Sequence, residues 1–139
     1  MERDKLEQSV NAMLMSFKIQ PDISGYDYLK SAIILCYEDE WLRNNISKKV
    51  YPLIGGIYNV SPEAVERAIR TAVENCFNCG GLLEINEKCG TVVYNNKFKW
   101  TNGEAISALT QLIKIEEGRE NIKKIVEDSK IIKGEKNEN

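Results

Sequence analysis

The segment from Ser47 to Phe77 constrains the fold more than any other part of the chain, because it marks a helix start at a defined residue. The run Asn59-Val60-Ser61-Pro62-Glu63 supplies a turn former, an N-cap serine, a proline at the first helical position and an acidic residue in the first turn. Gly80 and Gly81 provide a stop signal. The apolar residues between them recur at helical spacing, at Val65, Ala68, Ile69, Ala72, Val73 and Cys76. The sequence therefore predicts an amphipathic helix over residues 62–78.

A second apolar pattern precedes this helix and ends at Asn59. Its members are Val50, Tyr51, Leu53, Ile54, Ile57 and Tyr58. The three or four residues between the two patterns match the turn of a helix-turn-helix unit. Pro52 would remove a backbone hydrogen bond anywhere beyond the first helical turn, so we expect the earlier helix to start late or to be kinked.

The polar face of the 62–78 helix carries Arg67 and Arg70, one helical turn apart. In helix-turn-helix proteins the second helix enters the major groove and contacts base edges near its N-terminal end. An arginine guanidinium suits that task because it donates two parallel hydrogen bonds to guanine or to a phosphate. Lys48 and Lys49 would lie where the first helix crosses the sugar-phosphate backbone.

A plainer interpretation fits the same residues equally well. Glu63 with Arg67, and Glu66 with Arg70, are i,i+4 pairs that stabilise a solvated helix by only about 0.2–0.5 kcal/mol each. The net charge of −2 and the pI near 5.4 also argue against a protein that coats nucleic acid indiscriminately. From residue 43 to residue 74 five basic residues face three acidic ones, so the local excess is two positive charges.

Composition excludes several classes of function. A chain of 139 residues, 42% hydrophobic and 29% charged, suits one globular domain. No apolar run reaches the length of a bilayer span and the N-terminus is charged, so we expect a cytoplasmic protein without a membrane partner. The absence of histidine removes the usual general base and the commonest metal ligand, so we expect neither an enzyme nor a cofactor.

The four cysteines allow an alternative that involves a metal or a redox pair. Cys76 and Cys79 form a C-x-x-C pair, with Cys89 nearby in the sequence. Zinc sites usually show two such pairs or added histidines, and a thioredoxin-type motif needs a βαβ setting. Cys36 and Cys76 also fall on apolar helix faces, where a reduced, buried thiol is the commoner state, so we expect no metal and no disulfide.

The remaining patterns predict an all-α fold, a helix-turn-helix-containing bundle of about six helices. Two helices precede the motif, one from Leu6 to Phe17 and one after Gly25. A short helix ends at Gly90, and a small hairpin near residues 91–100 is an alternative to a loop there. Thr101 and Glu104 have capping-box spacing and start a further helix.

We expect a domain over residues 1–115 and a charged tail over 116–139 that is partly helical or disordered. The tail holds six basic and seven acidic residues, and its last residues have the composition of a disordered segment. The aromatic residues at helical spacing are predicted to be core, namely Trp41, Tyr51, Tyr58, Phe77 and Trp100. Tyr26 and Tyr28 flank a predicted helix start, where we expect half exposure.

Four stretches carry a specific resemblance, and they occur in a characteristic order and spacing. They are GYDYLKSAI at 25–33, YPLIGGIYN at 51–59, VERAIRTAVE at 65–74 and TNGEAISAL at 101–109. Together they resemble the C-terminal DNA-binding effector domain of the sporulation stage zero protein A response regulators, over about residues 6–115. The resemblance implies a transcription regulator that reads short DNA boxes through the helix at 62–78 and packs head to tail as a homodimer on tandem sites.

Carried over residue by residue, the resemblance implies that Glu66 and Arg67 look toward bases in the major groove and that Arg70 lies near the backbone. The family usually has a basic residue where this chain has Ala64, and a more helix-favouring pair in place of Gly55-Gly56. The full set of predicted DNA-contacting residues is Lys48, Lys49, Ser61, Glu63, Ala64, Glu66, Arg67, Arg70 and Thr71. RNA polymerase or a full-length response regulator are the expected protein partners.

The sequence starts with the first helix of the effector region, so the resemblance leads us to expect no receiver domain and no phosphorylation switch in cis. A second function is then open: a protein-interaction module that dimerises with a full-length response regulator and titrates it. The acidic pI, Ala64 and the charged tail favour that alternative. Arg67 and Arg70 oppose it.

Overall fold

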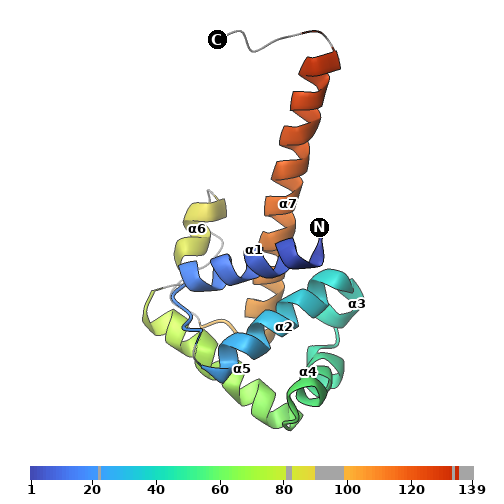
Figure 1. Ribbon diagram of the computed structural model, residues 1–139. Helices are drawn as coiled ribbons and strands as arrows, with labels where there is room; N and C mark the ends of the chain where they lie inside the picture. Colours follow the sequence, from blue (N-terminus) through green and yellow to red (C-terminus); the bar gives the residue numbers. More distant parts are fainter. Residues whose placement is uncertain (22, 81–82, 90–98, 133, 135–139) are drawn as a thin grey trace.

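The computed structural model describes residues 1–21, 23–80, 83–89, 99–132 and 134, and within them every regular element is a helix (Figure 1). The elements are α1 (Arg3–Ser16), α2 (Ser24–Glu38), α3 (Glu40–Arg43), the π-helical turn η1 (Ile46–Val50), α4 (Tyr51–Tyr58), α5 (Pro62–Asn78), α6 (Glu84–Cys89) and α7 (Asn102–Ile132). The predicted all-α class is confirmed. The hairpin considered near residues 91–100 lies outside the described residues except for Lys99 and Trp100.

Helix α2 is the centre of the fold, because α1, α3, α4, α5 and α7 all contact it. Its own buried residues include Leu29, Ala32, Ile33 and Cys36, which follow the apolar spacing of the sequence. α5 crosses α2 at close range at Gly25, where an added Cβ would overlap the carbonyl oxygen of Ala68. The core therefore lies between α2 and the helices around it, and α5 is held against it along one face.

The helix-turn-helix unit consists of α4 and α5, which pack against each other. α4 begins at Tyr51, so Pro52 stands in its first turn, as expected for a late start of this α-helix. The backbone is already helical before that point, because the π-helical turn η1 runs directly into α4 through Val50. At the other end Asn59 adopts a left-handed conformation with φ of 57°, and the Val60 amide donates to the Gly55 carbonyl at 2.9 Å.

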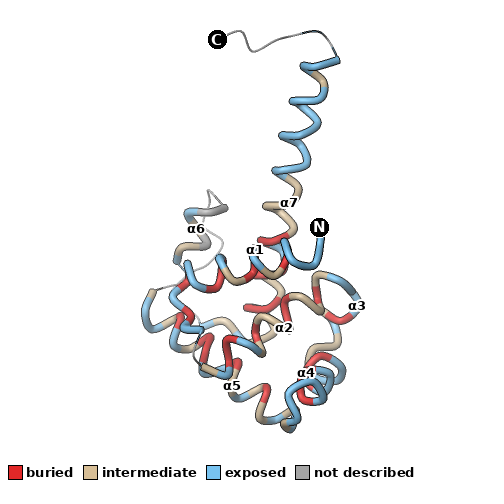
Figure 2. Tube along the Cα trace, in the orientation of Figure 1, coloured by how far each residue is buried: buried red, intermediate tan, exposed pale blue. Residues whose placement is uncertain are grey.

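Helix α7 starts at the predicted capping box. The Glu104 amide donates to Thr101 Oγ1 at 3.1 Å, and the Thr101 amide donates to Glu104 Oε1 at 3.0 Å. From Ala105 to Ile113 the helix lies in the core, and its C-terminal half then leaves the globular body and is exposed on nearly all sides (Figure 2). None of the helices in the described part of the chain combines the length and apolar composition needed to cross a membrane.

Several of the aromatic predictions are wrong. Trp41 is 56% exposed, because it lies in the four-residue helix α3, where Leu42 is the buried side chain. Tyr58 is 41% exposed, since it ends α4 and packs its ring edgewise on Tyr28 with 5.0 Å between centroids. Tyr26, expected to be half exposed, is buried and donates its hydroxyl to Asn11 Oδ1 at 2.7 Å. Tyr51 lies in the core as predicted.

Candidate DNA-binding surface

Helix α5 starts with the cap that the sequence predicts. The Ala64 amide donates to Ser61 Oγ at 3.1 Å, Pro62 stands in the first turn and Glu63 adds a negative charge beside the positive end of the helix dipole. The helix ends at Asn78, and Gly80 follows with φ of +71°. These local interactions fix the direction in which the α5 side chains project.

Helix α5 has one buried and one exposed face. Val65, Ile69, Ala72, Val73 and Cys76 are buried against the core, as the apolar spacing predicts. Among the predicted DNA-contacting residues of this helix, Glu63, Arg67, Arg70 and Thr71 are exposed, and Ala64 and Glu66 are half-buried. Most of the predicted DNA-contacting side chains of α5 are therefore exposed to solvent.

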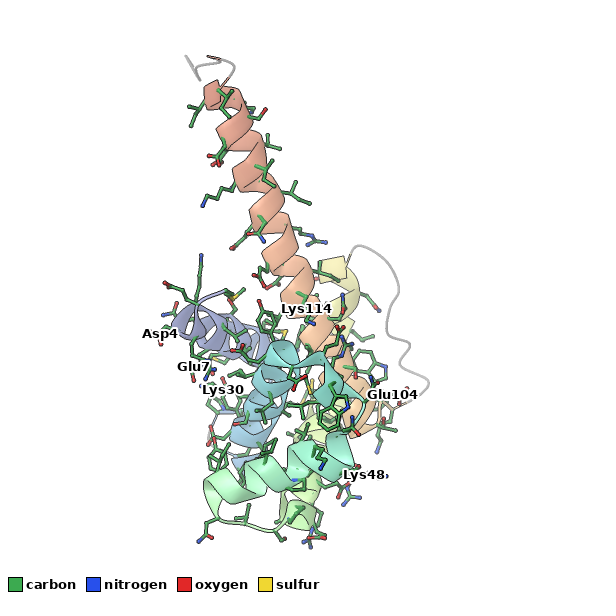
Figure 3. The ribbon with its side chains drawn as sticks, turned by 90° about the vertical axis from the view of Figure 1, so that its right-hand side faces the viewer. Asp4, Glu7, Lys30, Lys48, Glu104 and Lys114 are labelled. Carbon is green, nitrogen blue, oxygen red and sulfur yellow. The ribbon has the colours of Figure 1, made fainter. Side chains whose placement is uncertain are left out.

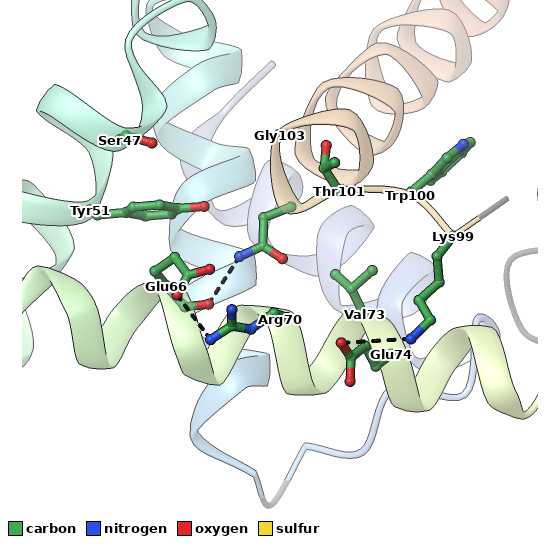
Figure 4. Close-up of a pocket in the computed structure, with 11 residues that line it drawn as sticks. Ser47, Tyr51, Glu66, Arg70, Val73, Glu74, Lys99, Trp100, Thr101 and Gly103 are labelled. Atoms are coloured by element: carbon green, nitrogen blue, oxygen red, sulfur yellow. Dashed lines mark hydrogen bonds and ion pairs between the residues drawn. The ribbon is translucent and has the colours of Figure 1, made fainter.

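Arg70 and Glu66 form an ion pair, with Arg70 Nη2 3.3 Å from Glu66 Oε2 (Figure 4). Asn102, from the first turn of α7, donates its side-chain amide to the Glu66 carbonyl at 2.9 Å. Tyr51 of α4 lies nearby, and burial raises the pKa of its phenol against the opposing effect of a hydrogen bond with Asn102. Glu66 and Arg70 thus line a hollow of about 450 Å³ between α4, α5 and α7 and are held there by neighbours.

Arg67 differs from Arg70, since its guanidinium has no ion pair or hydrogen bond to any residue that the structure describes. Its carbonyl accepts a hydrogen bond from Thr71 Oγ1 at 3.1 Å, which engages the Thr71 hydroxyl with its own helix. The i,i+4 pair that the sequence allowed between Glu63 and Arg67 does not form. Arg67 therefore stands exposed on the first two turns of α5.

Lys48 and Lys49 lie in η1, immediately before α4, and both are exposed. Figure 3 shows Lys48 at the surface of the molecule. Neither forms an ion pair with a described residue. Arg43, which also contributes to the local positive charge, is engaged elsewhere: its guanidinium reaches the Ser107 carbonyl at 3.3 Å and Glu40 at 3.7 Å. The charge count from the sequence treated Arg43, Lys48 and Lys49 alike, whereas in the structure only the two lysines are without an ion pair to a described residue.

On the α4 and α5 side of the molecule, some charged side chains form ion pairs and others do not. Glu66 is paired with Arg70, and Glu74 is paired with Lys99 at 3.8 Å. Within the described part of the chain, these pairs leave Arg67, Lys48 and Lys49 as uncompensated cations. Two exposed acids that form no ion pair with a described residue oppose them, Glu63 in the first turn of α5 and Glu104 in the first turn of α7. These five side chains leave an excess of one positive charge, although the whole chain carries a net charge of −2.

Comparison with known proteins agrees with this geometry. Residues 10–113 match the protein family described as Sporulation initiation factor Spo0A C terminal. The match runs from the middle of α1 to the end of the buried part of α7. The chain belongs to this family. The Spo0A C-terminal domain is a DNA-binding transcriptional effector domain and not an enzyme. The resemblance found in the sequence from about residue 6 to residue 115 is thereby confirmed.

Two residues of this Spo0A C-terminal domain were missed by sequence reasoning. Lys99 neutralises Glu74, and Asn102 bridges α7 to α5. Neither contact leaves a signal in the sequence, because each joins residues that lie 25 or more positions apart. The capping box placed Asn102 at the start of α7 but did not show which helix lies beside it.

The two cysteines of the C-x-x-C pair have different surroundings. Cys76 is fully buried and donates its thiol to the Phe17 carbonyl, with Sγ 3.0 Å from the oxygen, and burial raises its pKa to about 12. Cys79 is exposed. No group of three metal-ligating side chains occurs in the described residues, which do not include the Cys89 side chain. The buried thiol of Cys76 is thus a core group with weak acidity.

Proposed function

We propose that the chain is a sequence-specific DNA-binding transcription regulator in which α5 enters the major groove. The observation that carries the proposal is the exposed guanidinium of Arg67, held near the capped N-terminal end of α5 by a fully packed opposite face. In helix-turn-helix proteins that position contacts base edges, and arginine is the side chain that discriminates guanine best. In the proposed complex Arg67 specifies bases.

The other candidate residues take positioning roles in this proposal. Lys48 and Lys49, exposed in η1 just before α4, contact phosphates of the strand that the first helix crosses. Arg70 contacts the backbone while Glu66 fixes its orientation through their 3.3 Å ion pair. Glu63, Ala64, Thr71 and Ser61 surround the point where α5 meets the groove, and Ser61 also caps the helix. Phosphate contacts add affinity without sequence preference.

Two copies of the domain bind side by side on tandem sites in the proposed complex. The uncompensated positive charge beside α4 and α5 is small, three lysine and arginine side chains against Glu63 and Glu104, so few phosphates are neutralised per copy. A second copy doubles the number of contacts on one duplex. The family assignment supports DNA as the partner of each copy.

Selection of bound duplexes from a random pool tests the proposal directly. A true reader enriches a short motif that contains guanine, and the affinity for that motif falls linearly in log salt. The matched control is the same selection with Arg67→Lys, which keeps the charge and loses the bidentate fork. Enrichment of no motif by the unsubstituted chain would refute sequence-specific binding.

A second candidate function is a protein-interaction module that binds a full-length response regulator. The half-neutralised α5 face favours it, since Glu66 and Glu74 each occupy a cation that would otherwise meet phosphate. Titration of a labelled duplex at low salt separates the two functions. A module of this kind shows little binding at any salt concentration and forms a mixed complex with the full-length regulator.

A further inference from the structure

Asn102, the first residue of α7, lies where α7 meets the two helices of the helix-turn-helix unit. The capping box fixes its backbone, because Thr101 and Glu104 on either side form reciprocal hydrogen bonds of 3.0 and 3.1 Å. Ala105 and Ile106 are fully buried and anchor this end of α7 in the core. The half-buried side chain of Asn102 is therefore held at a defined place beside α5.

The Asn102 side chain contacts the backbone of α5 directly next to Arg67. Its amide nitrogen donates to the carbonyl oxygen of Glu66 at 2.9 Å, and Glu66 immediately precedes Arg67 (Figure 4). A carbonyl oxygen has two lone pairs, so it can accept this hydrogen bond in addition to the one within its own helix. Asn102 therefore restrains α5 at the turn from which the Arg67 side chain projects.

The same amide also contacts α4. It forms a hydrogen bond with the hydroxyl of Tyr51, whose side chain is 5% exposed and is therefore held firmly by the core. Tyr51 follows directly after η1, which carries Lys48 and Lys49. One side chain of α7 thus connects the segment with these two exposed lysines to the segment with the exposed arginine.

We propose that Asn102 is a positioning residue for DNA recognition, which fixes α5 relative to the lysines of η1 before DNA is bound. The inference rests on the proposed function, in which Arg67 contacts bases while Lys48 and Lys49 contact phosphates. Both kinds of contact form together on one duplex only when the two segments have the right relative placement. A protein that already has this placement loses less conformational freedom on binding. Asn102 itself does not touch DNA, because its amide is engaged within the protein.

Other contacts near Arg67 do not fix α5 in this way. The ion pair of Glu66 with Arg70 lies within α5, as does the hydrogen bond from Thr71 to the Arg67 carbonyl, so neither ties the helix to its neighbours. The buried face of α5 holds the helix against the core, but apolar packing is not directional. A hydrogen bond restrains both a distance and an angle. Asn102 adds that restraint next to the base-contacting side chain.

Fluorescence anisotropy with Asn102→Ala tests the role on two duplexes, the one that the unsubstituted chain selects and one of unrelated sequence. We expect the affinity for the selected duplex to fall about tenfold, because binding must then supply the order that Asn102 provides. The affinity for the unrelated duplex should change by less than about twofold, and the slope of log affinity against log salt should stay the same, since no phosphate contact is lost.

Asn11→Ala is the matched control for a loss of stability. Asn11 is half-buried like Asn102, and its side-chain oxygen accepts a hydrogen bond of 2.7 Å from the hydroxyl of the buried Tyr26. This hydrogen bond joins α1 to α2, which carry no predicted DNA-contacting residue. Both variants should lower the midpoint of thermal unfolding, whereas only Asn102→Ala should lower the ratio of the two affinities.

The positioning role is wrong if Asn102→Ala keeps the ratio of affinities, or if Asn11→Ala lowers it equally. Equal weakening of Asn102→Ala on both duplexes, together with a reduced salt slope, would show that Asn102 contacts a phosphate itself and would also overturn the role. The proposed function survives these outcomes. An unsubstituted chain that selects no duplex would instead refute the proposed function, and the role of Asn102 with it.

Discussion

Arg67 and Arg70 are one helical turn apart on α5, yet their surroundings assign them different tasks. The Arg70 guanidinium is held by Glu66, while that of Arg67 has no described partner. We expect Arg67→Ala to lower the affinity for the selected duplex by about 1–3 kcal/mol, the usual value of a bidentate base contact. Thermal unfolding should not change, because the side chain stabilises nothing in the fold. Fluorescence anisotropy with matched and mismatched duplexes measures the loss, and an equal loss on both would remove Arg67 from base recognition.

Gly55 and Gly56 are neighbours in α4 with opposite requirements. A Cβ on Gly55 would lie 2.5 Å from the Val60 carbonyl oxygen, where the chain turns back over α4, whereas a Cβ on Gly56 would meet nothing within 4 Å. We expect Gly55→Ala to destabilise the fold by about 1–3 kcal/mol through overpacking. Gly56→Ala should stabilise it by up to about 1 kcal/mol, since alanine favours a helix. Chemical denaturation measures the free energy of unfolding of both variants. A lower free energy of unfolding for Gly56→Ala would contradict the open space found beside Gly56.

At the scale of elements, the sequence predicted helices wherever a start signal coincided with an apolar period. The Ser61 cap, the Thr101 and Glu104 box and the displacement caused by Pro52 all appear in the structure. Local signals suffice for these features because caps and periods involve residues within four positions. The side chains that contact the polar face of α5 from other parts of the chain could not be predicted in the same way. Asn102 and Lys99 reach α5 only after the chain has folded.

Ser61, at the start of α5, caps the helix and is also one of the predicted DNA-contacting residues. Removing the cap in Ser61→Ala should lower the free energy of unfolding by about 1 kcal/mol. Ser61→Asp keeps a capping oxygen and favours the helix dipole, so stability should be retained. Its added negative charge should nevertheless weaken DNA binding if α5 enters a groove with this end. Equal DNA affinity of Ser61→Asp and the unsubstituted chain would mean that the end of α5 lies away from the duplex.

The whole molecule is closed at one corner by three segments that are far apart in the sequence. Tyr37 of α2 and the Met1 amine both contact Glu117 of α7. The hydrogen bond from Tyr37 lowers the pKa of the Glu117 carboxyl, with a further contribution from the amine. Burial, together with the hydrogen bond to Glu117, raises the pKa of Tyr37 to about 12. α7 leaves the body near this corner, so these contacts help to set the direction in which its exposed C-terminal half projects.

The stability of this corner should depend on pH in a way that Glu117→Gln reveals. Because the folded-state pKa of Glu117 lies below its unfolded value of 4.5, its contribution is present at neutral pH and is lost as the pH falls through the folded pKa. Thermal unfolding should therefore show Glu117→Gln to be less stable than the unsubstituted chain at pH 7, with a difference that shrinks on acidification. Tyr37→Phe is the control, since it leaves the carboxylate without its strongest partner and should reduce the same pH dependence. A difference between Glu117→Gln and the unsubstituted chain that stays constant from pH 7 into the acid range would show that the ionised carboxylate does not hold α7 to the body.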